Sequence, residues 1–230
     1  MAELTRRDLA RLIDHTLLAP EATAADVERF SREGVVLGVG AVCVSPTMVS
    51  VAVAVLPSDF VVASVVGFPS GAHLASVKAS EAERACVDGA REIDMVINLA
   101  AVGQGRWDEI SSEVSAVRRA IDSDVMLKVI IESALWGDDQ IAKTCVAAVS
   151  GGADFVKTST GYHKSGGATE HAVSLMRRTV GSEIGVKASG GVRTLASTIA
   201  MIEAGANRIG TSSAAAILEQ AAQELSAADS

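Results

Sequence analysis

DFVKTSTGY, residues 154–162, alternates between two sets of side chains in the way that a β-strand does. Phe155, Lys157 and Ser159 share one face of this strand, while Val156 and Thr158 take the other. A lysine therefore lies in the middle of a predicted strand.

GVKASGG, residues 185–191, repeats the arrangement further along the chain, with Lys187 on the same face as Gly185 and Ser189. The intervening segment 169–180 is predicted to be a helix. If the two strands are parallel neighbours joined by that helix, the amines of Lys157 and Lys187 point into one shared space.

The same order of strand and helix repeats along the whole chain. LIDHTLL, residues 12–18, fits either a strand or the end of a helix. Further strands are predicted at 35–44, 60–67, 92–98, 124–132 and 207–210, and further helices at 23–30, 47–56, 78–88, 107–121, 139–149, after Thr194 and at the end of the chain.

Counted with the first segment, these elements make eight strand-then-helix units, with no linker between them. The sequence therefore predicts one domain over residues 1–230, a single (β/α)8 TIM barrel. A doubly wound sheet is the alternative fold.

Charged side chains occupy one face of the central predicted strands. EIDMVIN carries Asp94 and KVIIE carries Lys128 on the faces opposite their apolar residues. Such alternation is also typical of antiparallel strands with one wet face, but helices between successive strands argue against that arrangement here. In a barrel the helix-facing side is apolar, as expected for Ile93, Met95, Ile97, Val125, Leu127, Val129, Val156 and Ala188.

The opposite faces then point into the barrel, so that Asp94, Lys128, Lys157 and Lys187 converge there. Asp94 could simply neutralise one lysine in a structural ion pair. Alternatively, a lysine beside other cations in a pocket of low dielectric loses proton affinity from its reference pKa of about 10.4, and its neutral amine can attack a carbonyl carbon. A carboxylate nearby suits proton transfer.

The last two predicted strands end in loops that suit an anion. Gly190, Gly191 and Arg193 follow one strand, and Gly210, Ser212 and Ser213 follow the other. Loops after strands seven and eight commonly bind phosphate in (β/α)8 enzymes. Each loop alone could be a plain tight turn, but the two together favour a phosphorylated substrate.

Composition excludes several other classes of protein. Among the 230 residues the net charge is -8 and 3% are aromatic, which disfavours a nucleic-acid partner. No apolar run is long enough to span a membrane and the start has no signal-peptide pattern, so we expect a cytoplasmic protein. Neither the cysteines (Cys43, Cys86, Cys145) nor the histidines (His15, His73, His163, His171) have metal-ligand spacing, so we expect no metal and no cofactor.

Eight segments, in this order along the chain, resemble the deoxyribose-phosphate aldolase family: LIDHTLL, AVCVSP, VVGFPSG, EIDMVIN, KVIIE, FVKTSTG, GVKASGG and RIGTSS. The resemblance implies a class I aldolase that cleaves 2-deoxy-D-ribose 5-phosphate to acetaldehyde and D-glyceraldehyde 3-phosphate, reversibly and without a metal. It implies a Schiff base on Lys157, a pKa-lowering role for Lys187, a proton relay through Asp94 and a supporting role for Lys128. The residues matching the family's phosphate region are Gly161, Gly190, Gly191, Arg193, Gly210, Ser212 and Ser213. A homodimer is expected from the resemblance alone.

The chain departs from some family members at two places. Tyr162 stands where some have a lysine after STG, so the phosphate loses one cation or takes it from elsewhere, such as Lys164. Some members end in a tyrosine that assists proton transfer, whereas this sequence ends in AADS; protonation of the enamine is then expected to rest on Asp94, Lys187 and water. Cys43 matches a family cysteine, and packing is its default role.

Two other functions fit the same residues. One is a different Schiff-base barrel aldolase that acts on another phosphorylated sugar. The other is a non-catalytic barrel that binds a phosphometabolite, although it gives no reason to keep two amines and an acid inside.

Overall fold

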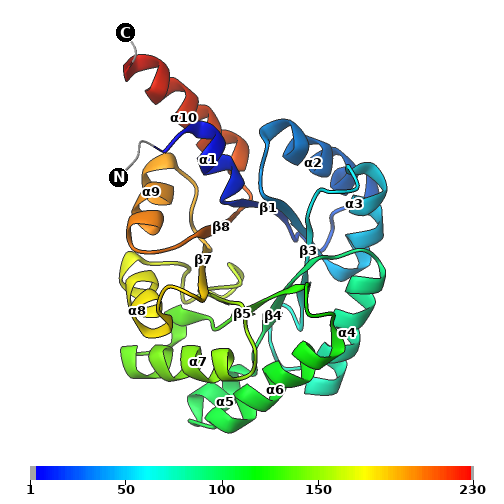
Figure 1. Ribbon diagram of the computed structural model, residues 1–230, viewed down its shortest axis with the longest axis vertical. Coiled ribbons are helices and arrows are strands. Elements are labelled where there is room, and N and C mark those ends of the chain that lie inside the picture. Colours follow the sequence, from blue (N-terminus) through cyan, green and yellow to red (C-terminus); the bar gives the residue numbers. More distant parts are fainter. Residues whose placement is uncertain (1–3, 229–230) are drawn as a thin grey trace.

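The computed structural model describes residues 4–228, and its centre is a closed ring of parallel strands (Figure 1). Each strand pairs with the next in the sequence, and β8 closes on β1. The prediction of a (β/α)8 barrel is confirmed, and the alternative of a doubly wound sheet is wrong. The strands are β1 Ile13–Leu17, β2 Ala41–Val44, β3 Val62–Val66, β4 Glu92–Val96, β5 Met126–Ile130, β6 Phe155–Lys157, β7 Gly185–Ser189 and β8 Arg208–Thr211.

The helices form an outer ring around the strands (Figure 1). They are α1 Arg6–Arg11, α2 Ala24–Leu37, α3 Val49–Val55, α4 Ala75–Val87, α5 Leu99–Gly103, α6 Trp107–Ala120, α7 Asp138–Ser150, α8 Glu170–Val180, α9 Leu195–Glu203 and α10 Ala214–Ala228, with short 3-10 helices η1 Pro46–Met48 and η2 Ser133–Leu135. Within residues 4–228 we find none that has the length and apolar character needed to cross a lipid bilayer.

Threonine side chains start several of the helices. Thr23 accepts a hydrogen bond from the Asp26 amide, and the Asp26 carboxylate accepts one from the Thr23 amide, which makes a capping box at the start of α2. Thr194 begins α9 in the same way, as the sequence predicts. Ser45 precedes Pro46 at the start of η1, and its side chain makes no capping hydrogen bond.

The apolar run 35–44 is not one strand. Its first residues extend α2, which buries Val27, Ser31 and Gly34 at helical spacing and leaves Val36 85% exposed. The helix ends at Gly38, whose φ of 75° lies in the left-handed region that glycine adopts at little cost. The strand begins only at Ala41.

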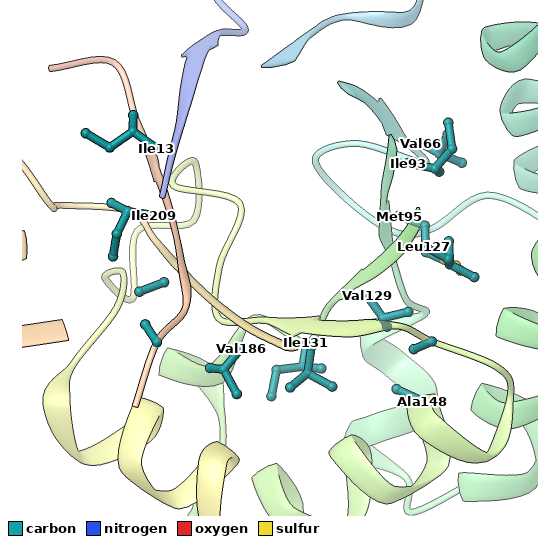
Figure 2. Packing of buried hydrophobic residues seen from close by; sticks show 14 of the residues in the cluster. Ile13, Val66, Ile93, Met95, Leu127, Val129, Ile131, Ala148, Val186 and Ile209 are labelled. Carbon is teal, nitrogen blue, oxygen red and sulfur yellow. The ribbon is translucent and has the colours of Figure 1, made fainter. Parts of the chain in front are cut away.

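The main hydrophobic core lies between the ring of strands and the helices. Figure 2 shows Ile93, Met95, Leu127 and Val129 on the outer side of β4 and β5, facing the helices. All the residues predicted to face the helices are buried. The opposite, charged faces of the same strands are consequently left for the barrel interior.

The first strand carries two very different side chains next to each other. Asp14 is fully buried and joins the charged interior, while His15 stacks on Phe30 of α2 with ring centroids 3.5 Å apart. The segment LIDHTLL, which the sequence leaves open between strand and helix end, is therefore a strand with a charged inner face and an aromatic contact on its outer face.

Candidate active site

Four of the predicted site residues meet inside the barrel. Asp94 lies between the lysines: its Oδ1 is 2.7 Å from Lys128 Nζ, and its Oδ2 is 2.7 Å from both Lys157 Nζ and Lys187 Nζ. The strands explain this arrangement, because Asp94 is in register with Lys128 and Lys157 is in register with Lys187. All four side chains are buried. Two amines thus share one carboxylate oxygen.

The interior also holds charged groups that the sequence pattern did not predict there. Asp14 accepts hydrogen bonds from Lys187 and from Arg208 Nη1, the latter at 2.9 Å. Glu92 accepts one from Arg208 at 3.1 Å and lies 2.5 Å from Lys128. The expectation of one carboxylate among three ammonium groups is therefore wrong. The cluster holds four cations and three carboxylates, namely Lys128, Lys157, Lys187, Arg208, Asp14, Glu92 and Asp94.

The two reactive-site lysines differ in proton affinity. Burial lowers the pKa of Lys157, and the Lys187 cation lowers it further, against the opposing effect of Asp94. Burial also acts to lower the pKa of Lys187, but the carboxylates of Asp14 and Asp94 outweigh it and raise that pKa. Lys157 is therefore the amine that gives up its proton first.

Neighbouring cations favour the ionised forms of Asp94 and Asp14. Burial acts to raise the pKa of Asp94, but Lys128, Lys157 and Lys187 outweigh it and hold the pKa well below the usual range. The pKa of Asp14 is also lowered, because Lys187 and its neighbouring cations outweigh burial. A carboxylate that stays charged beside two amines can accept and return a proton.

Lys157 opens onto a pocket of about 290 Å³. The loops after β6, β7 and β8 supply most of the predicted phosphate residues, and six of the seven line this pocket: Gly161, Gly190, Gly191, Arg193, Gly210 and Ser212. Ser213 is not in its lining, and the Ser213 amide donates to Thr211 Oγ1 instead. The other residues of the pocket lining, which the predicted site does not include, are Thr16, Leu17, Leu18, Ala19, Thr160, Tyr162, Ser189, Val192 and Thr211.

Thr16 and Leu17 end β1, Leu18 and Ala19 follow it, and barrel closure places β1 beside β8. These residues reach the pocket because the barrel closes, and the pattern within LIDHTLL alone does not show that closure. Arg193 and Lys157 are the cationic side chains among the pocket residues described. Lys164, which the sequence offers as a source of the phosphate-binding cation in place of a lysine after STG, is exposed and does not line the pocket.

Two further residues of interest are Tyr162 in the pocket lining and Cys43 on β2. Tyr162 is 51% exposed and meets the ring of Phe68 edge-on, with centroids 5.3 Å apart. Cys43 is buried on β2, and burial, with a further contribution from Asp94, raises the pKa of its thiol to about 11. A protonated thiol packed with Ala63 and Val65 agrees with a packing role. Within residues 4–228 no three His, Cys, Asp or Glu side chains are grouped so as to hold a metal ion.

Comparison with known proteins shows the family to which the chain belongs. A family model described as DeoC/LacD family aldolase matches residues 9–220. The chain belongs to this aldolase family. The family resemblance read from the sequence motifs is thereby confirmed.

Relatives of this aldolase align over nearly their whole length. The deoxyribose-phosphate aldolase of Corynebacterium diphtheriae is 53% identical over 216 residues, covering 94% of this chain and 98% of that protein. The deoxyribose-phosphate aldolase of Kocuria rhizophila is 51% identical over 216 residues, with the same coverage of 94% and 98%.

Solved structures agree with the fold. An aldolase designated QR15 superposes with a TM-score of 0.90 at 38% identity, covering 96% of this chain and 98% of its own. A deoxyribose phosphate aldolase from Aeropyrum pernix, described as tetrameric, gives a TM-score of 0.84 at 34% identity and covers 94% of this chain and 91% of its own.

Proposed function

We propose that this aldolase cleaves 2-deoxy-D-ribose 5-phosphate reversibly to acetaldehyde and D-glyceraldehyde 3-phosphate through a Schiff base on Lys157. The observation that carries the proposal is the buried Lys157 amine, which lines the pocket and touches the same Asp94 oxygen as Lys187. The relatives named deoxyribose-phosphate aldolase support the choice of substrate.

In the forward direction the neutral Lys157 amine attacks the C1 carbonyl of the open-chain sugar, and loss of water gives an iminium ion. Removal of the C3 hydroxyl proton breaks the C2–C3 bond and releases glyceraldehyde 3-phosphate. The two electrons of that bond form an enamine, which takes a proton at C2 and is hydrolysed to acetaldehyde and free Lys157. The iminium nitrogen serves as the electron sink throughout.

Asp94 and Lys187 carry protons in this proposal. Asp94 Oδ2 touches both amines, so a proton that leaves Lys157 has a direct route to the Asp94–Lys187 pair. Lys187 keeps its own proton because Asp14 and Asp94 raise its pKa, and its charge disfavours protonation of Lys157. Lys128 neutralises the other Asp94 oxygen and holds the carboxylate in place.

The phosphate group would lie at the far end of the pocket. Gly161, Gly190, Gly191 and Gly210 have no Cβ, so backbone N–H groups there are accessible to phosphate oxygens. Arg193 supplies a positive charge and Ser212 a hydroxyl. Ser213 would contribute only indirectly, through its bond to Thr211.

Borohydride trapping tests the Schiff base. Incubation with acetaldehyde and borohydride should leave an ethyl group on Lys157, because the reductant fixes the iminium formed there. Peptide mass spectrometry locates the label. A label on Lys187 alone, or no label, would contradict the assignment. The variant Lys143→Leu, which alters a lysine exposed on α7, is the matched control and should trap normally.

The variant Lys187→Leu belongs to the same test. Without the Lys187 cation the pKa of Lys157 should rise, and each unit of rise reduces the neutral amine about tenfold below that pKa. We expect a nearly inactive enzyme at neutral pH, measured by a coupled assay for glyceraldehyde 3-phosphate with a chelator present. A panel of other sugar phosphates separates this activity from that of a different aldolase, and ligand stabilisation without turnover would favour a binding protein.

We infer that the 230 residues form one domain, that the protein acts in the cytoplasm and that it assembles as a homodimer. The tetrameric description of the Aeropyrum pernix protein supports self-association in general.

A further inference from the structure

Glu132 has an unusual backbone and an unusual environment. It follows β5 with φ 51° and ψ 56°, and among residues 4–228 it is the one residue other than glycine that has a positive φ. Left-handed backbone is costly for a residue with a Cβ. The side chain is also 1% exposed, although it carries a carboxylate. Both costs require surrounding contacts that hold the residue in place.

Those contacts lead to the loop after the Lys157 strand. The Glu132 carboxylate accepts a hydrogen bond from Thr160 Oγ1 at 2.6 Å and lies 3.2 and 3.3 Å from the Thr160 amide nitrogen. Thr160 Oγ1 in turn accepts from the Tyr162 amide at 3.1 Å. A chain of hydrogen bonds therefore runs from a buried acid just after β5 through Thr160 to Tyr162.

The other side of this loop is held by β7. Thr158 Oγ1 accepts from the Ser189 amide at 3.0 Å, and Ser189 Oγ donates to the Ser159 carbonyl at 2.6 Å. The loop is thus anchored to Glu132, which follows β5, on one side and to Ser189 of β7 on the other. Thr160, Gly161 and Tyr162 all line the pocket, whereas Glu132 does not.

We propose that Glu132 is a positioning residue that holds the 160–162 loop as one wall of the substrate pocket at its phosphate end. It acts through Thr160 and does not touch the substrate. The inference rests on the proposed function for its kinetic consequences. The contacts themselves involve no step of the reaction at Lys157, so the effect of losing Glu132 falls on substrate binding rather than on formation of the Schiff base.

The test is the variant Glu132→Gln, which preserves size but replaces the charged acceptor. Losing a charge-assisted hydrogen bond should raise KM for deoxyribose 5-phosphate about tenfold and weaken inhibition by inorganic phosphate similarly. Trapping of acetaldehyde on Lys157 should proceed at the parental rate, because acetaldehyde has no phosphate. Glu183→Gln, which alters an exposed glutamate, is the matched control and should change neither quantity.

Thr160→Val is the second variant, because it removes the hydroxyl and leaves the Glu132 backbone untouched. It should reproduce the rise in KM, and combining it with Glu132→Gln should add little further. Thr160→Val therefore tests the proposal even if Glu132→Gln does not fold. An unchanged KM in both variants, or an equal loss of acetaldehyde trapping, would overturn the proposal, since a general loss of folding lowers all activities together.

Hydrogen exchange of the Thr160 and Tyr162 amides gives a readout that needs no activity at all. Exchange should be faster in Glu132→Gln than in the parent and in Glu183→Gln. Unchanged exchange refutes the positioning role whatever reaction the protein performs. If exchange is faster in Glu132→Gln than in the parent but the parent traps no acetaldehyde, the proposed function is refuted and the positioning role stands.

Discussion

Asp14 shows how one buried carboxylate can set the charge of a neighbouring amine. It hydrogen-bonds Lys187 and Arg208 and is itself fully buried. Its charge is one of the two that raise the pKa of Lys187. Lys187 is therefore cationic because of a residue on the opposite end of the sequence, and that cation is what disfavours protonation of Lys157.

The variant Asp14→Asn should move the pH profile of activity. Removing the negative charge lowers the pKa of Lys187 and, through the more positive interior, that of Lys157, so both limbs of the profile should shift to lower pH. Loss of a charge-assisted hydrogen bond should also lower kcat about tenfold at neutral pH. Measuring kcat against pH checks this. Asp139→Asn, on the exposed surface of α7, is the control. An unshifted alkaline limb would contradict the role of Asp14.

At this scale the sequence predicted part of the charged cluster. Asp94, Lys128, Lys157 and Lys187 were found because the sequence around each of them alternates between two faces, even though β6 itself is only three residues long. Asp14 was missed because LIDHTLL fits two kinds of element. Arg208 was missed because it is the first residue of its strand, and it pairs with Asp14 only after the barrel closes.

Among the elements, α2 has a start that the sequence predicts and an end that it does not. Its capping box at Thr23 is local and follows from residues three apart. Its last turn, however, is rich in valine, and Val35 to Leu37 continue directly into an apolar strand region. Only packing of Val27, Ser31 and Gly34 against the barrel shows that the helix extends to Leu37.

Thr23→Ala should weaken α2. Loss of a threonine N-cap costs about 1 kcal/mol of unfolding free energy. The Thr23 hydroxyl is also the main cause that lowers the pKa of Asp26 to about 2, so that pKa should rise toward 3.8 in the variant. NMR titration of Asp26 and urea unfolding measure both effects. Ser50→Ala, on the exposed face of α3, should change neither. A pKa of Asp26 that stays near 2 would contradict the capping box.

At the scale of the whole molecule, closure of the barrel determines which charges meet. The alternation and the order of elements were enough to predict eight parallel strands and an inward-facing set of charges. They could not show the register between β1 and β8, in which Asp14 lies opposite Gly210. Nor could they show that Arg208 hydrogen-bonds both Asp14 and Glu92. Such pairs depend on three-dimensional proximity between distant segments.

The charged interior should make the protein sensitive to acid. Asp14 and Asp94 have pKa values below the unfolded value of 3.8, so the unfolded chain binds more protons once the pH falls toward that value. Their contribution to stability is present above about pH 4 and is lost as the pH falls through the lower folded values. Urea unfolding at a series of pH values measures this.

The comparison variant for the acid test is Lys187→Leu, which removes a cation that lowers both pKa values. Its stability should fall less steeply with acid than that of the parent. An unfolding free energy that stays constant between about pH 5 and pH 3 in the parent would show that these carboxylates do not stabilise the folded state through their charges.

The stack of His15 on Phe30 has a consequence for the residue next to it. In a β-strand a shift of pairing by one residue exchanges the two sides, which here would bring an imidazole among the ammonium groups and a carboxylate against a phenyl ring. Neither exchange is tolerable, so the aromatic contact acts as a register lock. The contact between His15 and Phe30 outside the barrel thereby keeps the Asp14 carboxylate inside it.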